Sequence, residues 1–327
     1  MPFSAGLDAL CALPAVALAQ YPTPVEPLSR LRAALGTGPR LLIKRDDAIT
    51  FGFGGNKVRK IEMLAASALE DDADVLITTG GVQSNHCRVT AAAAARLGMR
   101  CVIVANGAPP ERLTGNALLD HLFGAEVRYV ATREERAPAM EAIAECLRAE
   151  GSHPVVIPLG ASTPLGSAGV ARAVGELVSQ LDEPPDCIFH STSSGGTQAG
   201  LVAGCSLYGV HSRVIGVSAD EPAGRLQATV SGIVEGLGEL LGMDAGKLAA
   251  ARPIEVETRY IGEGYGIPTE ASREAQSLLA RTEAIVVDHT YTAKALAGLI
   301  GWVREGRFRE TDTVLFWHTG GQVGVFA

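Results

Sequence analysis

The patterns that most directly indicate nucleic-acid or membrane binding are missing from this sequence. Its 327 residues carry a formal net charge of -8 without a long basic run, so we expect no nucleic-acid partner, although small anionic ligands can still bind locally. No stretch reaches the ~18 consecutive apolar residues of a membrane span, so we expect no membrane partner. The Ala- and Leu-rich stretch 9–20 has no basic residue before it, because Arg30 is the first, and it does not predict a secretion signal.

Cysteine and histidine are present, but not in the spacings of a metal site or a disulfide framework. The seven histidines contain no HxxxH pair. The cysteines contain no CxxC pair and are scattered along the chain at positions 11, 87, 101, 146, 187 and 205. Free thiols fit a reducing compartment, so we expect a cytoplasmic protein without a metal site.

The sequence is rich in glycine and in alternating strand-like and helix-like segments. Its 38 glycines exceed the ~7% norm, which predicts many tight turns and close backbone approaches to ligands. The alternation favours an α/β fold, with mostly parallel sheets covered on both faces. We expect residues 1–40 to form an irregular arm. The expected strands are 41–43, 75–78, 101–105, 126–130, 154–158, 186–190, 214–218, 254–257 and 313–317, and the expected helices are 85–96, 113–123, 133–149, 163–180, 223–239 and 293–305, with others from 56, up to 207 and up to 283.

Lys57 follows the glycine-rich segment 51–55 and precedes apolar residues at helical spacing, so we expect it in the first turn of a helix that starts near Asn56. The helix dipole disfavours a cation there, and Arg59 and Lys60 add positive charge. Both effects, together with burial, are expected to lower the pKa of the Lys57 amine. A lysine of this kind is a nucleophile for Schiff base formation with a carbonyl. The alternative interpretation is a solvated basic helix start.

A second segment has the pattern of a phosphate-binding loop. Ser194, Gly195, Gly196 and Thr197 lie between an expected strand and an expected helix. Glycines permit close backbone approach, and backbone N–H groups at the helix start bind anions, with the hydroxyls as further donors. The segment is not a Walker loop, because no lysine follows the glycines. The alternative is a plain tight turn.

Other polar residues fall at the carboxyl ends of expected strands, where open α/β sheets bind ligands. Ser84 and Asn85 follow the strand at 75–78, and Thr319 follows the strand at 313–317. An N-cap is the structural alternative for Ser84 or Asn85. Tyr265 and Tyr291 lie beside a glycine turn or just before a helix, and could equally be packed aromatics. For His86, inside the same polar motif as Ser84, we expect a packing role at the helix start.

A nucleophilic lysine, a phosphate loop and a strand-end hydroxyl are the groups that the aldehyde, phosphate and ring nitrogen of pyridoxal phosphate require. Over nearly its whole length the sequence resembles the fold-type II, tryptophan synthase β-like, pyridoxal phosphate enzymes. Within them it resembles the D-cysteine desulfhydrase / 1-aminocyclopropane-1-carboxylate deaminase family. The motifs that carry the resemblance are Pro22-Thr23-Pro24, Lys44-Arg45-Asp46-Asp47, Gly55-Asn56-Lys57-Val58-Arg59-Lys60, Gln83-Ser84-Asn85-His86, Ser194–Gly200, Gly264-Tyr265-Gly266, Tyr291-Thr292-Ala293-Lys294 and His318-Thr319-Gly320-Gly321.

The resemblance implies a role for each candidate residue. Lys57 would bind pyridoxal 5'-phosphate as a Schiff base, and Asn85 would donate a hydrogen bond to its ring oxygen. Ser84 would bind the substrate carboxylate. The remaining implied roles are phosphate binding by Lys60 with Ser194, Gly195, Gly196 and Thr197, contact with the substrate by Tyr265 and Tyr291, and contact with the pyridine nitrogen by Thr319.

Two positions distinguish the subfamilies. The deaminases resemble one another in having Glu after the second active-site tyrosine and Leu at the threonine of the His-Thr-Gly-Gly motif, whereas this chain has Thr292 and Thr319. A carboxylate at the ring nitrogen keeps it protonated and makes the ring a strong electron sink, as opening a cyclopropane demands. A hydroxyl is a weaker partner that suffices to expel a good leaving group. The segment 321–324 also departs from the family pattern and leaves the substrate side chain open.

The resemblance implies two α/β domains: a large cofactor domain of residues 1–50 and 160–327, and a small inserted domain of residues 51–159. It also implies a homodimer. The expected reaction is α,β-elimination of a small amino acid, most simply D-cysteine, to pyruvate, sulfide and ammonia, with Lys57 or a tyrosine taking the Cα proton. The alternatives are an L-cysteate sulfo-lyase, a 1-aminocyclopropane-1-carboxylate deaminase and, from another class, a non-catalytic phosphate- or nucleotide-binding protein.

Overall fold

Two sheets organise the part of the chain that the computed structural model describes, residues 3–36 and 38–327. The larger sheet has the strand order β1-β2-β10-β7-β8-β9, and all of its pairs are parallel except β1 with β2. Its strands are β1 (Val25–Pro27), β2 (Arg40–Arg45), β7 (Cys187–Thr192), β8 (Arg213–Ser218), β9 (Glu255–Glu257) and β10 (Thr313–His318). The predicted α/β class with mostly parallel sheets is confirmed.

The smaller sheet has the order β5-β4-β3-β6 and is parallel throughout. Its strands are β3 (Val75–Gly81), β4 (Arg100–Asn106), β5 (Glu126–Val130) and β6 (Pro154–Ile157). The apolar run at 75–77 is buried on both faces of the sheet, which is the pattern of a strand covered from both sides. These strands all fall inside the segment 51–159, but the two domain boundaries themselves stay a prediction.

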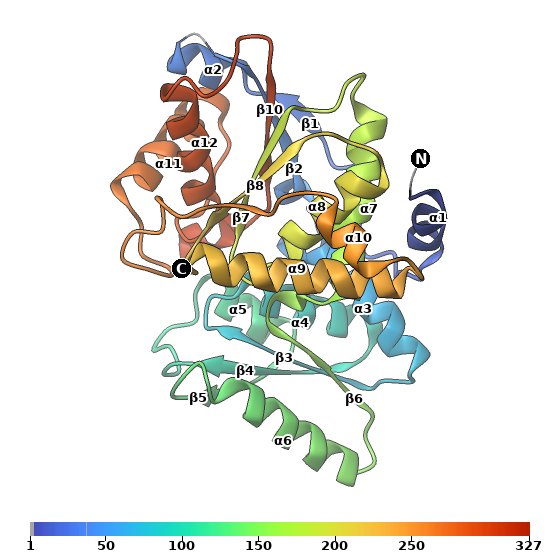
Figure 1. The fold of residues 1–327 in the computed structure, drawn as a ribbon. Coiled ribbons are helices and arrows are strands. Elements are labelled where there is room, and N and C mark those ends of the chain that lie inside the picture. Colours follow the sequence, from blue (N-terminus) through green and yellow to red (C-terminus); the bar gives the residue numbers. More distant parts are fainter. Residues whose placement is uncertain (1–2, 37) are drawn as a thin grey trace.

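Helices cover both faces of each sheet (Figure 1). In the larger sheet, α12 packs on β7 and β8 with α11 and α2 outside it, and α7, α8 and α9 form the opposite layer. In the smaller sheet, α6 covers one face and α4 with α5 the other. The helices are α1 (Ser4–Ala12), α2 (Ser29–Leu35), α3 (Lys57–Glu70), α4 (Asn85–Leu97), α5 (Gly115–Leu122), α6 (Arg136–Ala149), α7 (Pro164–Gln180), α8 (Gly196–Leu207), α9 (Ala223–Leu240), α10 (Ala245–Ala250), α11 (Glu270–Glu283) and α12 (Thr292–Arg304).

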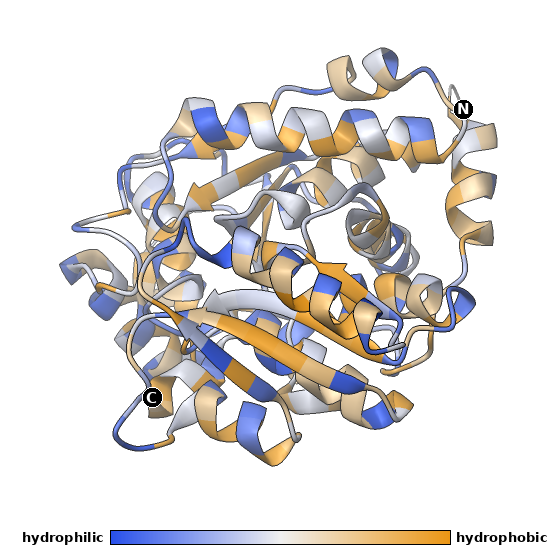
Figure 2. Ribbon diagram, turned by 90° about the horizontal axis from the view of Figure 1, so that it is seen from below, coloured by the Kyte–Doolittle hydropathy of each residue, from blue (hydrophilic) through white to orange (hydrophobic). Residues whose placement is uncertain are grey.

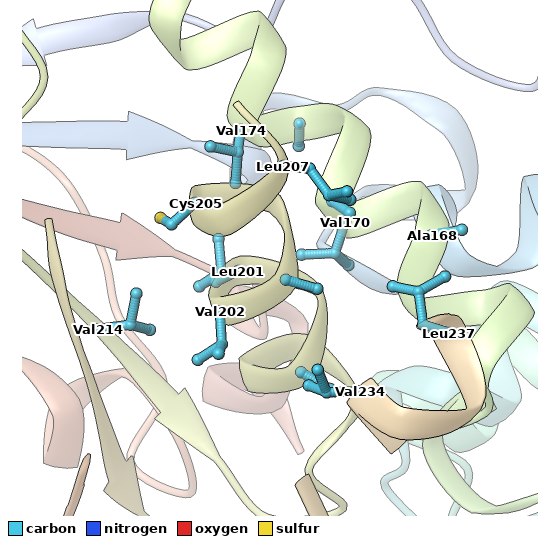
Figure 3. Close-up of a cluster of buried hydrophobic side chains, with 14 of the residues drawn as sticks. Ala168, Val170, Val174, Leu201, Val202, Cys205, Leu207, Val214, Val234 and Leu237 are labelled. Atoms are coloured by element: carbon cyan, nitrogen blue, oxygen red, sulfur yellow. The ribbon is translucent and has the colours of Figure 1, made fainter. Parts of the chain in front are cut away.

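The largest apolar core lies between the larger sheet and the layer of α7, α8 and α9. Figure 3 shows side chains of this core from four elements: Val170 and Val174 of α7, Leu201 and Val202 of α8, Val214 of β8, and Val234 and Leu237 of α9. In Figure 2 the central strands are mostly hydrophobic, whereas the outer helices alternate along their length. Burial of this kind contributes roughly 25 cal/mol per Å² of apolar surface, so this layer is a rigid support for whatever α8 presents at its first turn.

The expected irregular arm at residues 1–40 is partly wrong, apart from residues 1, 2 and 37, which lie outside the described residues. Helix α1 forms because Leu10 is fully buried against α7 and α8. Strand β1 forms although it contains Pro27, because an edge strand pairs on one side only and Pro27 is its last residue. Helix α10 is a further element that the sequence did not predict, and its N-cap is Asp244, whose carboxylate accepts the Lys247 N–H.

A buried ionic network joins the arm, β2, α3 and α7. Arg59 donates to Asp46 and to Glu176, both at 2.8 Å, and Glu176 also pairs with Lys44. Asp46 accepts a further hydrogen bond from Trp317 Nε1, at 2.8 Å. Two cations thus balance two carboxylates, as buried charges require. Because Arg59 lies in the first turn of α3, the network fixes the position of the residue that begins this helix, Lys57.

Candidate active site

A cavity of about 630 Å³ lies at the carboxyl ends of strands from both sheets. Gly81 of β3, Asn106 of β4 and Thr192 of β7 end their strands at its wall. Most residues singled out from the sequence line it: Lys57, Ser84, Asn85, Ser194, Gly195, Thr197, Tyr265, Tyr291 and Thr319. Lys60 and Gly196 do not line it themselves, but both donate a hydrogen bond to Ser162, which does. These residues are spread along the chain from position 57 to position 319, yet they line one cavity. This is what the position of ligand sites at the carboxyl ends of parallel strands predicts.

Lys57 is the first residue of α3, as expected. Burial lowers the pKa of its amine to about 8, so roughly a tenth of the amine is unprotonated at pH 7, far more than for an ordinary lysine. The expected contribution of Arg59 is wrong, because that guanidinium pairs with Asp46 and Glu176 in the ionic network. The expected contribution of Lys60 is wrong as well, because burial alone lowers the pKa of Lys57. The influence runs the other way: the pKa of Lys60 is lowered by burial and then by the charge of Lys57.

The predicted phosphate loop, Ser194–Thr197, lies between the cavity and the side chain of Lys60. Lys60 Nζ donates to Gly160 O at 3.1 Å and to Ser162 Oγ at 3.3 Å. A Cβ added at Gly196 would lie 2.7 Å from both Lys60 Nζ and Ser162 Oγ, so only glycine fits there. Gly196 N–H donates to Ser162 Oγ at 3.2 Å, and Ser162 Oγ lies 2.8 Å from Ser194 Oγ. Hydroxyls, the Lys60 amine and the first turn of α8 are a suitable donor set for a phosphate.

The segment 84–86 lies at the start of α4, and it confirms the N-cap alternative for Ser84 and the packing role expected for His86. Ser84 is the N-cap, since its Oγ accepts the Cys87 N–H at 3.3 Å. His86 is packed, with Nε2 2.7 Å from Thr78 Oγ1. Neither contact removes Ser84 from the cavity, which it lines together with Asn85.

Tyr265 and Tyr291 meet at the cavity, with their hydroxyl oxygens 2.5 Å apart. Burial raises the pKa of both phenols. Two residues for which the sequence predicted no role hold the segments that carry them. Asp288 accepts the Tyr291 N–H at 2.9 Å, and Lys294 donates to Gly264 O, at 2.8 Å, beside Tyr265. Both tyrosines are therefore fixed, protonated hydrogen-bond donors at neutral pH.

Thr319 and Thr292 differ sharply in their surroundings. Thr319 lines the cavity, and its Oγ1 lies 3.0 Å from Ser191 Oγ, a neutral partner at the end of β7. Thr292 is fully buried, and its Oγ1 donates to Asp288 at 2.6 Å and more weakly to Gly320 O at 3.5 Å. Thr319 is thus placed to meet a ligand, whereas Thr292 supports the turn that carries Tyr291.

The geometry fits pyridoxal phosphate on this chain's own features. Gly196 forms a cradle that a Cβ would fill, the hydroxyls and Lys60 supply donors for a phosphate, and Lys57 supplies an amine with a lowered pKa. A ring between these groups would lie against Thr319. Ser162, Ser191 and Asp288, which complete the site, carry no local motif and are found only from the fold.

Comparison with known proteins agrees with this geometry. The family model described as pyridoxal-phosphate dependent enzyme matches residues 16–320. Two D-cysteine desulfhydrases, from Salmonella typhi and Klebsiella pneumoniae (strain 342), are each 37% identical over 98% of this chain and 98% of their own. A crystal structure of an ACC deaminase homologue is 36% identical, with a TM-score of 0.90 over 98% of this chain and 96% of that one.

The chain belongs to the pyridoxal-phosphate dependent enzymes, and its fold is the fold-type II arrangement that the sequence predicted. Its cofactor is pyridoxal 5'-phosphate. Within that family it is similar over its full length to the D-cysteine desulfhydrases, a group of lyases. The non-catalytic phosphate- or nucleotide-binding alternative therefore loses its support.

Proposed function

We propose that this enzyme converts D-cysteine and water to pyruvate, hydrogen sulfide and ammonia. The observation that carries the proposal is the Thr319–Ser191 pair, which offers neutral hydroxyls where the ring nitrogen is expected. It agrees with the activity named for the curated relatives of full length. The cofactor supplies an electron sink when it is bound. Side chains of this chain bind the substrate and transfer the protons.

The side chains divide the proton transfers between them. Lys57, whose pKa lies at about 8, is the base for the Cα proton, because its amine can be neutral at the pH of the reaction. The tyrosines cannot act as bases at rest, since burial raises their pKa values. We assign them instead as donors toward the departing sulfur. Ser84, at the start of α4, binds the substrate carboxylate together with the backbone N–H groups of that helix.

The roles of the remaining residues follow the same geometry. Asn85 would donate a hydrogen bond to the ring oxygen of the cofactor, and Thr319 would contact the ring nitrogen; both residues line the cavity. Lys60 and the loop of Ser194, Gly195, Gly196 and Thr197 hold the phosphate. Within the described residues no helix is both long and apolar enough to cross a membrane. We propose that the protein is a cytoplasmic homodimer and that residues 51–159 form a small inserted domain. Sedimentation tests the dimer, and limited proteolysis tests the domain boundaries.

Ring-opening deamination is the second candidate, because the similar crystal structure is that of an ACC deaminase homologue. The buried environment of Thr292 argues against it. A glutamate there would meet Asp288, whose carboxylate already accepts from Thr292 Oγ1 at 2.6 Å. A second carboxylate at this position would be buried against that of Asp288, and like-charge repulsion disfavours it.

The proposal is tested by a panel of β-substituted amino acids with parallel assays for pyruvate, sulfide and sulfite. We expect sulfide and pyruvate in equal amounts from D-cysteine, less from L-cysteine, and little sulfite from L-cysteate. Lys57→Ala is expected to abolish both products and to leave the bound cofactor untrapped by borohydride. Preferential release of sulfite from L-cysteate would show that the proposed leaving group, sulfide, is wrong. A preference for L-cysteine over D-cysteine would show that the proposed chirality of the substrate is wrong.

A further inference from the structure

Asn116, on α5, was not singled out from the sequence, and it touches the cofactor residue Asn85 from behind. Its side chain is fully buried. Asn116 Nδ2 donates to the backbone carbonyl of Gln83 at 2.9 Å and to Asn85 Oδ1 at 3.0 Å. The backbone N–H of Asn116 donates in turn to Gln83 Oε1 at 2.8 Å. The residue is therefore locked on both sides by the segment that begins α4.

These contacts determine which way each amide points. A backbone carbonyl can only accept, so the atom of Asn116 that contacts Gln83 O must be the NH₂ group. The same NH₂ group reaches Asn85, so the atom of Asn85 that it meets must be the carbonyl oxygen. Asn85 is then left with its own NH₂ group, two donors, for the cavity. Asn85 Nδ2 lies on the side of Gly321, where an added Cβ would be 3.3 Å from it.

The arrangement has a cost that a purely structural residue would avoid. Among the described residues, the Oδ1 atom of Asn116 is buried without a hydrogen-bond partner. A buried unpaired carbonyl is unfavourable, and rotating the amide would offer it different neighbours. The rotation would, however, direct Oδ1 at Gln83 O and release Asn85. The site thus retains an unsatisfied atom in order to keep two acceptors bound to one NH₂ group.

We propose that Asn116 is a positioning residue that holds the Asn85 amide with its NH₂ group toward the cavity, so that Asn85 donates to the ring oxygen of the cofactor. This inference rests on the cofactor role assigned to Asn85 under the proposed function, but not on the identity of the substrate. A donor facing the ring oxygen stabilises its anionic form, and an acceptor there would repel it.

Two variants of Asn116 separate positioning from packing. Asn116→Leu keeps the approximate size and frees Asn85, whereas Asn116→Asp offers acceptors only, so that Asn85 must turn its NH₂ group away from the cavity. We expect pyridoxal phosphate to bind the apoprotein about tenfold more weakly in the leucine variant and up to about a hundredfold more weakly in the aspartate variant. The pH at which the visible band of the bound cofactor titrates should rise in the same order. His121→Ala, exposed on the same helix, is the control and should change neither.

A double-mutant cycle with Asn85→Ala decides the mechanism. If Asn116 acts through Asn85, Asn116→Asp has no further effect on cofactor binding or on the titration in the Asn85→Ala background. Unchanged binding and titration in a folded Asn116→Asp protein would overturn the inference, as would an effect that persists without the Asn85 amide. Thermal melting of each apoprotein establishes folding. If wild type fails to release sulfide from D-cysteine while the cycle shows coupling, the proposed substrate is wrong and the role of Asn116 stands.

Discussion

The hydroxyl oxygens of Tyr265 and Tyr291 lie 2.5 Å apart, although the residues come from a glycine turn and from the start of α12. Their rings meet edge to face, with centroids 5.6 Å apart. Burial raises the pKa of each phenol, so the pair stays protonated and one hydroxyl must donate to the other. The second proton of the pair is then free to face a ligand in the cavity.

Replacing either tyrosine therefore tests the donor role. Tyr291→Phe and Tyr265→Phe should each lower kcat for sulfide release about a hundredfold, the usual scale of general acid catalysis. Cofactor binding should change less than threefold, since neither hydroxyl is assigned to it. Tyr260→Phe, away from the cavity, is the matched control. Steady-state kinetics on all three variants check the prediction, and full activity in Tyr291→Phe would remove the pair from the reaction.

The lowered pKa of Lys57 predicts how the apoprotein takes up its cofactor. Only the neutral amine attacks a carbonyl, and burial lowers the pKa of this amine to about 8. Below that pH the reactive fraction falls tenfold per unit, and above it the fraction is nearly constant. Stopped-flow absorbance with added pyridoxal phosphate should show the attachment rate rising to a plateau with a midpoint near pH 8. A midpoint close to 10.5, the value of an ordinary lysine, would show that the amine is not desolvated.

The space behind Gly196 predicts the effect of a single methyl group. Gly196→Ala places a Cβ 2.7 Å from Lys60 Nζ and Ser162 Oγ, both of which must then move. We expect at least a tenfold loss of cofactor affinity with the fold retained. Gly232→Ala is the control, because nothing lies within 4 Å of its added Cβ. Equilibrium dialysis measures the affinity and circular dichroism the fold. A folded Gly196→Ala protein with wild-type affinity would exclude this loop from phosphate binding.

The sequence predicts every described strand except β1, most of the described helix starts and the loop residues, because each of these has a local signature. Lys57 begins a helix after glycines, and Gly196 lies between a strand and a helix. Sequence reasoning could not find Ser162, Ser191 or Asn116, because each is an ordinary polar residue whose role depends on a partner far along the chain. It also misjudged Arg59, since its partner Glu176 is 117 residues away. The prediction of an irregular arm at residues 1–40 was wrong for the same reason, because Leu10 of α1 is buried against α7 and α8, which lie far along the chain.

The position of Thr292 changes what a subfamily exchange requires. Thr292→Glu would bury a second carboxylate against Asp288, so we expect it to lower the free energy of unfolding by about 3 kcal/mol. Adding Asp288→Asn removes the like charge and should restore most of that loss. Urea unfolding of the single and double variants measures both. An unchanged free energy of unfolding in Thr292→Glu would contradict this prediction, since it would mean that a glutamate at position 292 is not held in contact with the Asp288 carboxylate.

The central claim is the subfamily chemistry, and the products of two substrates test it most directly. Wild-type enzyme is given D-cysteine and, separately, 1-aminocyclopropane-1-carboxylate, and each mixture is assayed for pyruvate and 2-oxobutanoate. Because Thr319 meets Ser191 rather than a carboxylate, the account predicts pyruvate from D-cysteine and at least a tenfold lower kcat/KM for the cyclopropane acid, a difference of ~1.4 kcal/mol. Efficient formation of 2-oxobutanoate, with D-cysteine left unchanged, would contradict it.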